Sequence, residues 1–218
     1  MRKKGSLLRE LPILVVVALV VSLFIKTFVV QFFYIPSGSM ENTLQIKDRV
    51  AVNKIPFISR SINRGDVVVF RDPDNWLPEI VDYDTNKYVS KAKSALVAVG
   101  VLPNPTKQYL VKRVIGVEGD HIVCCTKAGN LTINDVEVTE PYIYGGNKPS
   151  EMKFDVTVPK GKLWVMGDHR GASADSRYHQ EDINKGFVPI SRVTGRVVAV
   201  IWPFKNITYV PKVDVLKK

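Results

Sequence analysis

A long apolar run near the N-terminus dominates the pattern of hydrophobic and polar positions. Residues 11–25 are apolar apart from Ser22, and a second apolar stretch follows at 28–35. A membrane-spanning helix needs about 20 residues. The run reaches that length when Lys26 extends its amine toward the membrane surface. We therefore expect a transmembrane anchor over residues 11–30.

The charges on either side of this run predict its orientation. Residues 1–10 carry four basic side chains, whereas only Lys47 and Arg49 lie within about 20 residues after the run. The positive-inside rule places residues 1–10 in the cytoplasm and residues 31–218 outside, in a single-pass protein of the cell membrane. A cleaved signal peptide is disfavoured, because the run ends in FVVQFFYIP and lacks the small residues of a cleavage site.

Beyond residue 35 the pattern changes to short runs rich in Val, Ile, Tyr and Phe, separated by Gly, Pro, Asn or Asp. Many short strands joined by turns predict a mainly β fold of curled antiparallel sheets. Asn134-Asp135 between two runs suggests a tight hairpin. The expected strands are 49–54, 66–71, 108–116, 121–126, 131–134, 136–139, 155–158, 162–167 and 193–202.

One stretch interrupts this strand pattern. Residues 72–107 contain no convincing strand, and within them 88–101 is rich in Ala, Lys and Leu and is followed by Pro103 and Pro105. We expect 72–107 to be an insertion that carries one helix. The strands at 121–160 are expected to form a smaller β subdomain.

Composition narrows the classes of partner. The net charge of +10 is spread along the chain, without an RNA-binding motif or zinc-finger spacing. Next to an apolar N-terminus, this charge favours a phospholipid surface over nucleic acid.

The cysteines and histidines indicate neither a disulfide framework nor a metal site. The two cysteines, Cys124 and Cys125, are adjacent in the sequence. Neighbouring Cα atoms lie about 3.8 Å apart, closer than the roughly 4.4–6.8 Å of an ordinary disulfide. Two thiols on a strand are therefore favoured over a strained vicinal disulfide. The histidines His121, His169 and His179 have no clustered thiol partners, and no metal or cofactor is expected.

A serine-rich turn follows the apolar run directly. In the segment Pro-Ser-Gly-Ser-Met, Gly38 separates Ser37 from Ser39 and permits a tight turn whose N–H groups can face a ligand. A serine hydroxyl becomes a good nucleophile only when a base takes its proton. Taken alone, this segment is weak evidence for catalysis, because most loop serines are solvated or cap helices.

A lysine lies within one of the expected strands. The segment YLVKRVIG places Lys112 and Arg113 on opposite faces of a strand that is otherwise apolar. Both faces cannot be polar, so one of the two side chains is expected to enter an apolar environment. The alternative is an edge strand from which both charges reach water.

A third polar segment completes a set of ordered motifs. Residues 167–177, GDHRGASADSR, follow an apolar strand and are dense in Asp, Arg and Ser. Together with PSGSM and its following Thr43-Leu44, and with KRVIG at 112–116 followed by Gly119-Asp120, they resemble the motifs of bacterial type I signal peptidases. The segments RGDVVVF and KIPF between them are also similar. The resemblance covers most of residues 30–200.

The resemblance implies a membrane-anchored serine endopeptidase without metal or cofactor. Ser39 would be the nucleophile and Lys112 its general base, and the Ser37 hydroxyl and the Ser39 backbone N–H would stabilise the oxyanion. Ser173 would orient the lysine amine, while Asp175, Arg177 and Arg113 would brace the loop. The substrates implied are secretory preproteins cut after a small-x-small site, bound extended along a strand edge.

The third motif departs from the family pattern. His169 stands where Asn is usual, and Gly171-Ala172 where Asp-Asn is usual, which puts the rigidity of the loop in doubt. Histidine serves as the base in relatives of the endoplasmic reticulum. Here Lys112 occupies the position of the base, so His169 is disfavoured in that role.

Apolar segments are candidates for contact with lipid. Residues 32–34, 56–58 and 202–204 are rich in aromatic side chains, and those of 32–34 would lie at the level of the headgroups. For 56–58 and 202–204, an ordinary place in the core is an equal alternative.

Three other functions compete with the peptidase. A self-cleaving Ser/Lys repressor would carry a DNA-binding head instead of the apolar N-terminus. An inactive membrane-anchored scaffold would not need both Ser39 and Lys112. A protein that binds cell-wall polyanions would leave the three motifs unexplained.

Overall fold

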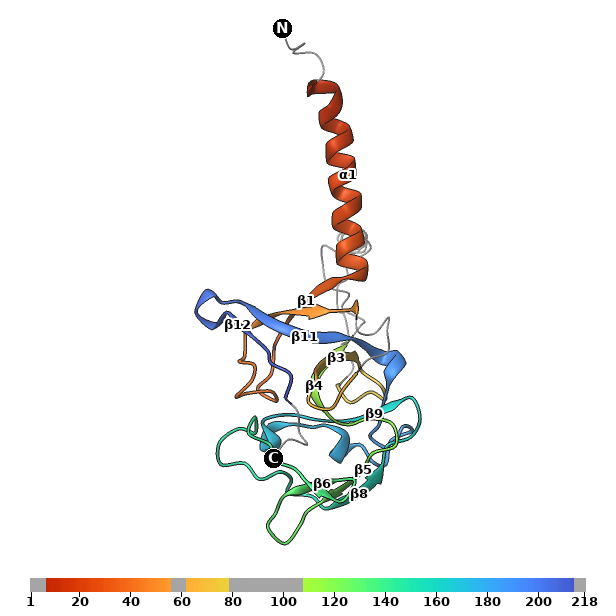
Figure 1. Ribbon diagram of the computed structural model, residues 1–218, viewed down its shortest axis with the longest axis vertical. Coiled ribbons are helices and arrows are strands. Elements are labelled where there is room, and N and C mark those ends of the chain that lie inside the picture. Colours follow the sequence, from red (N-terminus) through yellow and green to blue (C-terminus); the bar gives the residue numbers. More distant parts are fainter. Residues whose placement is uncertain (1–6, 56–61, 79–107, 214–218) are drawn as a thin grey trace.

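A single helix projects from a β body in the computed structural model, which describes residues 7–55, 62–78 and 108–213 (Figure 1). Helix α1 (Leu7–Phe28) begins the described chain, with Pro12 in its first turns. Pro12 is the sixth residue of the helix, beyond the first four N–H groups that have no intrahelical partner, so it removes the hydrogen bond that an N–H at this position would make to the carbonyl of residue 8. In the described ranges, no helix has the length and apolar character required to cross a membrane.

The expected mainly β architecture is confirmed. Each predicted run contains a strand, with ends that shift by at most a few residues, and all the pairings are antiparallel. The strands are β1 (Val30–Tyr34), β2 (Arg49–Asn53), β3 (Val67–Arg71), β4 (Tyr109–Gly116), β5 (His121–Cys124), β6 (Leu131–Ile133), β7 (Val136–Glu137), β8 (Phe154–Thr157), β9 (Lys162–Met166), β10 (Val188–Pro189), β11 (Val193–Trp202) and β12 (Thr208–Tyr209).

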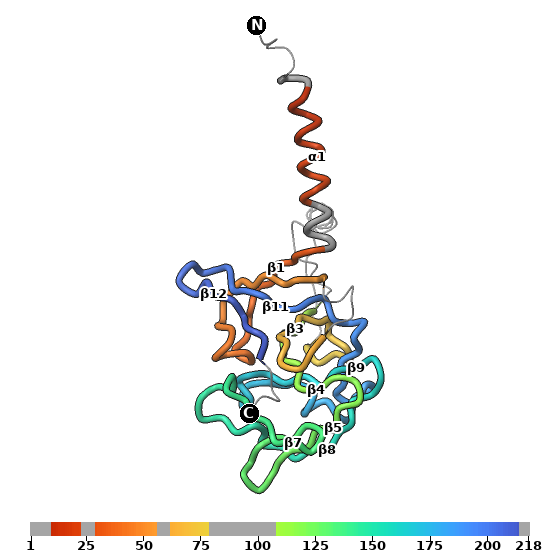
Figure 2. The backbone as a smooth tube through the Cα atoms, in the orientation of Figure 1, coloured from red at the N-terminus to blue at the C-terminus, as the bar shows by residue number. Residues whose placement is uncertain are grey.

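Strand β1 was not expected, because its sequence continues the apolar run of the predicted anchor. Its residues pair with β2 along the whole strand. Phe33 packs into the core and meets the ring of Tyr109 edge-on at 5.0 Å, whereas Phe32 and Tyr34 are exposed. This alternation is typical of a strand with one buried face. The tube in Figure 2 shows α1 leading directly into β1.

The larger sheet has the order β1-β2-β11-β3-β4-β9-β10, with β12 added to β11. The long strand β11 therefore lies between β2 and β3, which precede it by more than a hundred residues in the chain (Figure 2). Its register shifts at Val193/Gly195, Val197/Ala199 and Val200/Trp202. Such bulges bend a strand and increase its twist, so they curl the sheet.

The smaller sheet has the order β7-β6-β5-β8. Asn134 and Asp135 connect β6 to β7 with φ values of 51° and 66°, and Ile133 pairs with Val136. Two consecutive positive φ values define the tight hairpin turn that Asn and Asp tolerate, so the predicted hairpin is confirmed. The buried side chains of this sheet share one core cluster with Trp164 and Met166 of β9.

The expectation of two free thiols is wrong. Cys124 and Cys125 form a disulfide. The peptide bond between them is cis, and their Cα atoms are 3.0 Å apart rather than at the trans spacing from which the expectation was argued.

The helix expected at 88–101 lies outside the described residues. Residues 56–58, one of the apolar segments expected to contact lipid, also lie outside them. The described beginning of the predicted insertion, 72–78, is a loop organised by one carboxylate. Asp72 accepts hydrogen bonds from the backbone N–H groups of Asp74, Trp76 and Leu77. This loop carries Trp76 to the edge of the site described next.

Candidate active site

Ser39 lies in a tight turn between β1 and β2. The Glu41 N–H donates to the Gly38 carbonyl at 2.9 Å, and the Leu44 N–H donates to the Met40 carbonyl at 2.8 Å. Met40 and Leu44 are buried in the core beneath the turn. Apolar packing below the turn and backbone hydrogen bonds within it hold the serine in one position.

Lys112 and Arg113 are both buried, at 4% and 1% exposure. The sequence predicted an apolar environment for only one of them, and that prediction was too narrow. β4 is flanked by β3 and β9, so it is an interior strand at this point. Lys112 pairs in register with Val68, and Arg113 pairs with Met166. The alternative of an edge strand with both charges in water is excluded.

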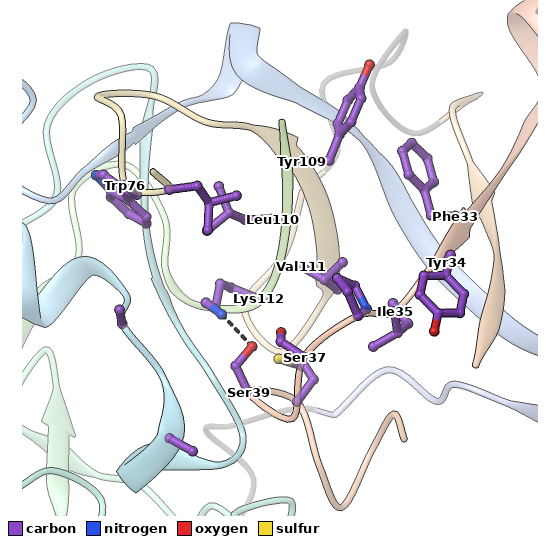
Figure 3. A pocket seen from close by; sticks show the side chains of 15 residues that line it. Phe33, Tyr34, Ile35, Ser37, Ser39, Trp76, Tyr109, Leu110, Val111 and Lys112 are labelled. Carbon is purple, nitrogen blue, oxygen red and sulfur yellow. Dashed lines mark hydrogen bonds between the residues drawn. The ribbon is translucent and has the colours of Figure 1, made fainter. Parts of the chain in front are cut away.

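The amine of Lys112 meets the hydroxyl of Ser39. The Nζ–Oγ distance is 2.6 Å, and both residues are buried (Figure 3). Burial lowers the pKa of Lys112 from 10.5 to about 8, because the charged amine loses its hydration. The carboxylates of Asp175 and Asp168 oppose this fall in the pKa, and Arg177 adds to it. With such a pKa about one-tenth of the amine is neutral at pH 7, far more than for an ordinary lysine.

An apolar cleft of about 270 Å³ opens beside this pair. Figure 3 shows Ser39 and Lys112 near its middle, Phe33 and Tyr34 on one side, and Trp76 and Leu110 on the other. Ser37 also lines the cleft and lies beside Ser39. The remaining lining residues are Ile35, Pro36, Met40, Leu77, Tyr109, Val111, Ala172 and Ala174.

Asp175 and Arg177 form a buried two-pronged ion pair. Arg177 Nε donates to Asp175 Oδ1 at 2.8 Å, and Nη2 donates to Oδ2 at 2.9 Å. Asp175 also accepts from the Gly167 N–H at 3.0 Å and from the Ser173 hydroxyl at 2.7 Å. Burial is the largest single effect on the pKa of Asp175 and raises it, but Arg177 and these hydrogen bonds together outweigh burial and hold the pKa below its usual value. The loop at 167–177 is thus fixed by charges that satisfy each other.

Gly167 brings the 167–177 loop very close to the turn at 38–44 that carries Ser39, here called the nucleophile turn after the proposed role of Ser39. A Cβ at this position would lie 2.3 Å from Ser173 Oγ and 2.5 Å from the Ser39 carbonyl oxygen. Only a residue without a side chain allows this approach. Ser173 makes its hydrogen bond to Asp175, and within the described chain none is present from the Lys112 amine to Ser173. The expected orientation of the amine by Ser173 therefore stays a prediction.

Arg113 contacts the 167–177 loop through Asp168. Its guanidinium donates to the Asp168 carboxylate from Nε at 2.8 Å and from Nη2 at 2.6 Å. It also donates to the Gly65 carbonyl at 2.7 Å and to the Thr43 hydroxyl at 3.0 Å. Thr43 in turn donates to Asp168. The Arg113 pair thus connects β4, the nucleophile turn and the 167–177 loop.

A third buried ion pair, between Arg170 and Glu140, was not predicted from the sequence. Arg170 donates to Glu140 from Nη2 at 2.6 Å, and both side chains are at most 3% exposed. Tyr142 donates its hydroxyl to Glu140, and its ring lies 4.1 Å from the Arg113 guanidinium. Arg170 was visible within the motif, but nothing near Glu140 in the sequence marked it as the partner.

The ring of His169 does not contact the Ser39 hydroxyl; its hydrogen-bonding partner is Glu41. The ring nitrogen Nδ1 is 2.9 Å from a carboxylate oxygen of Glu41, and the ring stacks on Tyr144 at 4.1 Å. Gly171, another departure from the motif, donates its N–H to Asn147 Oδ1 at 2.8 Å. The substituted loop is therefore held by contacts to Glu41 and Asn147.

Comparison with known proteins shows the family of this chain. Residues 8–202 match the sequence profile of the family described as signal peptidase, peptidase S26. The chain belongs to this family. Signal peptidases are serine endopeptidases, and this chain is one of that type.

Several relatives of this signal peptidase are bacterial proteins named signal peptidase I. The chain is 39% identical over 228 residues to a probable signal peptidase I of Mycobacterium leprae, covering 92% of this chain and 78% of that protein. It is 34% identical over 207 residues to probable signal peptidase I-2 of Synechocystis, covering 95% and 76%. A crystal structure of a signal peptidase I from Enterococcus faecalis aligns with a TM-score of 0.38 at 23% identity, over 62% of this chain and 96% of that one.

Proposed function

We propose that this protein is a membrane-bound endopeptidase that removes N-terminal signal peptides from secreted preproteins after a small-x-small site, with Ser39 as nucleophile and Lys112 as general base. The observation that carries the proposal is the 2.6 Å contact between the buried Lys112 amine and the Ser39 hydroxyl at the wall of an apolar cleft. An inactive scaffold has no need to bury an ionisable amine against a serine.

The reaction follows from the positions of these groups. Neutral Lys112 takes the proton of the Ser39 hydroxyl as Oγ attacks the substrate carbonyl. The resulting oxyanion accepts hydrogen bonds from the Ser39 backbone N–H and the Ser37 hydroxyl. The Lys112 ammonium then gives its proton to the leaving amine as the peptide bond breaks, which leaves an acyl-enzyme. Lys112 next takes a proton from water as the water oxygen attacks the acyl carbonyl. The Lys112 ammonium then returns this proton to Ser39 Oγ as the ester bond breaks, which releases the acyl group as a carboxylic acid and regenerates both residues.

An open strand edge supports binding of an extended substrate. β9 pairs with β4 from Arg113 onward, so Tyr109–Val111 have a partner in β3 on one side and none on the other within the described chain. The cleft lies along these residues. An extended peptide can add to such an edge through main-chain hydrogen bonds, and its alternate side chains enter pockets on one face.

The first test is the specificity of cleavage. With a preprotein carrying Ala at the first and third positions before the bond, the purified chain in detergent should cut once, after the first Ala. Leu at either position should lower kcat/KM by about 100-fold or more, because the small cleft excludes the added methylenes. Leu at the second position is the control and should have little effect, because an alternate side chain points away from the cleft. Equal cutting of all variants would contradict the assigned specificity.

The rate of cleavage should also depend on the protonation of Lys112. The base must be neutral, so kcat/KM should rise with pH and level off above about 8, the lowered pKa of this amine. A rate that is already flat between pH 6 and pH 9 would rule out Lys112 as the base. The profile is read from initial rates with a substrate that has no titratable groups near the cut.

The proposal places the enzyme at the cell membrane, with residues 1–10 in the cytoplasm and the β body outside. Apolar side chains on all sides of α1 support this placement: Leu11, Ile13, Leu14, Val15, Val16, Val17, Leu19, Val20 and Val21 are each at least 50% exposed. A helix that is apolar all round is typical of a helix within a membrane or a protein core.

Residues 202–204, which begin at the last residue of β11, are another segment expected to contact lipid. Trp202 and Phe204 are 43% and 75% exposed and pack edge-on against each other, so the alternative of an ordinary core position is excluded. Phe32 and Tyr34 of β1 are also exposed. Aromatic side chains favour the membrane–water interface.

Fluorescence quenching tests this contact in the full chain. In vesicles of brominated phospholipids the tryptophan emission should be partly quenched, and Trp202→Phe should remove most of the quenching. The other tryptophans, Trp76 and Trp164, are buried and act as internal controls. Quenching that persists in the variant would show that Trp202 does not contact lipid.

A further inference from the structure

His169 contacts the nucleophile turn at two points, once through its backbone and once through its ring. Its backbone N–H donates to the Ser39 carbonyl at 3.1 Å. Its ring nitrogen Nδ1 lies 2.9 Å from Oε2 of Glu41, the last residue of the same turn. A single residue of the 167–177 loop therefore holds both the nucleophile and the end of the turn that carries it.

The Glu41 carboxylate lies across the turn rather than pointing into solvent. A Cβ built at Gly38 would lie 2.9 Å from both Cδ and Oε2 of Glu41. The carboxylate therefore rests against the residue that directly precedes Ser39, and only 25% of the Glu41 side chain is exposed. Glu41 and His169 together form a strap over the turn.

The ring of His169 is itself anchored to the buried part of the site. It stacks on the ring of Tyr144 at 4.1 Å with an interplanar angle of 15°. The Tyr144 N–H donates to the carbonyl of Asp168, whose carboxylate is bound by Arg113. The strap thus connects the nucleophile turn to the same rigid brace that holds β4, the strand that carries Lys112.

Neither member of the strap is placed to react with substrate. Within the described chain, Glu41 and His169 are not among the residues that line the cleft, and the Ser39 hydroxyl is occupied by Lys112. We propose that the Glu41–His169 pair is a positioning device that holds the Ser39 hydroxyl at hydrogen-bonding distance from Lys112. The inference rests on the proposed function, since it assumes that these two groups are the catalytic pair.

The chemistry of position 169 is consistent with this role. In the family motif the residue here is usually Asn, whose side-chain amide nitrogen is as far along the chain from the backbone as Nδ1 of histidine. An asparagine can therefore donate to the Glu41 carboxylate from nearly the same place. The backbone contact to Ser39 does not depend on the side chain at all.

A double-mutant cycle in the full-length enzyme tests the inference. His169→Ala and Glu41→Ala should each lower kcat about 10-fold, because a displacement of the order of 1 Å in a reacting group can cost up to about 100-fold. The double variant should be no slower than either single variant. KM should stay the same, since neither side chain lines the cleft. His169→Asn should retain most of the activity.

A similar pair elsewhere in the chain provides the control. His121 and Asp155 form a histidine–carboxylate contact of 2.7 Å on the smaller sheet. His121→Ala should leave kcat and KM unchanged. Thermal unfolding midpoints of all the variants should agree with the parent within a few degrees, which separates positioning from loss of fold.

The outcomes distinguish the inference from the function on which it rests. Additive losses in the double variant, a loss that falls on KM, or failure of His169→Asn to retain activity would overturn the positioning role while the parent still cuts. A parent that does not cut any preprotein would overturn the proposed function itself, and the positioning role with it.

Discussion

Replacing Lys112 with methionine is expected to abolish cleavage and, at the same time, to stabilise the protein. Methionine keeps the length of the side chain and removes the amine, so Ser39 loses its base. The rate should fall about 10,000-fold or more, as it does when a catalytic base is removed from a serine peptidase. The gain in stability arises because burial of the charged amine opposes folding at neutral pH.

The size and pH range of that gain follow from the pKa. The folded value is about 8 and the ordinary value 10.5, so the protonated amine destabilises the fold by about 3 kcal/mol. Because the folded pKa is the lower one, the cost is fully present below about pH 8. It disappears as the pH rises toward 10.5, where the unfolded chain also loses its proton.

Activity and denaturation of the same samples check both parts of this prediction. Lys162→Met is the matched control. Lys162 lies on a strand of the same sheet as Lys112, is half-buried, and donates to Asn184 at 3.0 Å. This control should leave cleavage almost unchanged. If Lys112→Met retains activity at any pH between 6 and 10, the assigned base is wrong, and His169 becomes the next residue to test.

Removal of Arg113 should destabilise the protein strongly. Arg113→Met leaves the carboxylate of Asp168 buried without its partner, since the two side chains are 1% and 0% exposed. Such a change costs about 3–5 kcal/mol, a large part of the roughly 5–15 kcal/mol that stabilises a typical domain. The midpoint of urea unfolding in detergent should fall accordingly.

An exposed ion pair and a double variant complete this test. Lys148→Met removes the exposed pair with Glu151 and should change the free energy of unfolding by less than about 1 kcal/mol. Adding Asp168→Leu to Arg113→Met should restore part of the loss, because the orphaned charge is gone. Equal effects of Arg113→Met and Lys148→Met would show that the buried pair does not hold the loop in place.

The strands were predictable because the signal for each is local. Short runs rich in Val, Ile and Phe between turn residues gave β2, β3, β4 and β9 nearly to their ends. The turn at Asn134-Asp135 was predictable for the same reason, since its geometry depends on two adjacent residues. Strand β1 was missed because a partly buried strand and the end of a membrane helix are both continuous apolar runs.

The site was predictable only as far as the motifs extend. Ser39, Lys112, Asp175 and Arg177 lie within them, but the partners that fix the loop do not. Glu140 is distant in sequence from Arg170 and lies in a polar segment without periodicity. Such pairings depend on how the two sheets pack together, and a single sequence carries no record of that packing. The burial of both Lys112 and Arg113 was missed for the same reason, because alternation describes one strand and not what covers its two faces.

The place of β11 in the sheet has a consequence for biosynthesis. The turn with Ser39 belongs to the β1–β2 side of the sheet, Lys112 belongs to the β3–β4 side, and β11 is the strand that joins them. A nascent chain that has not yet reached residue 193 lacks this strand, although residues 39 and 112 have already been made. We therefore expect cleavage activity to appear only after β11 has been synthesised and has taken its place between β2 and β3.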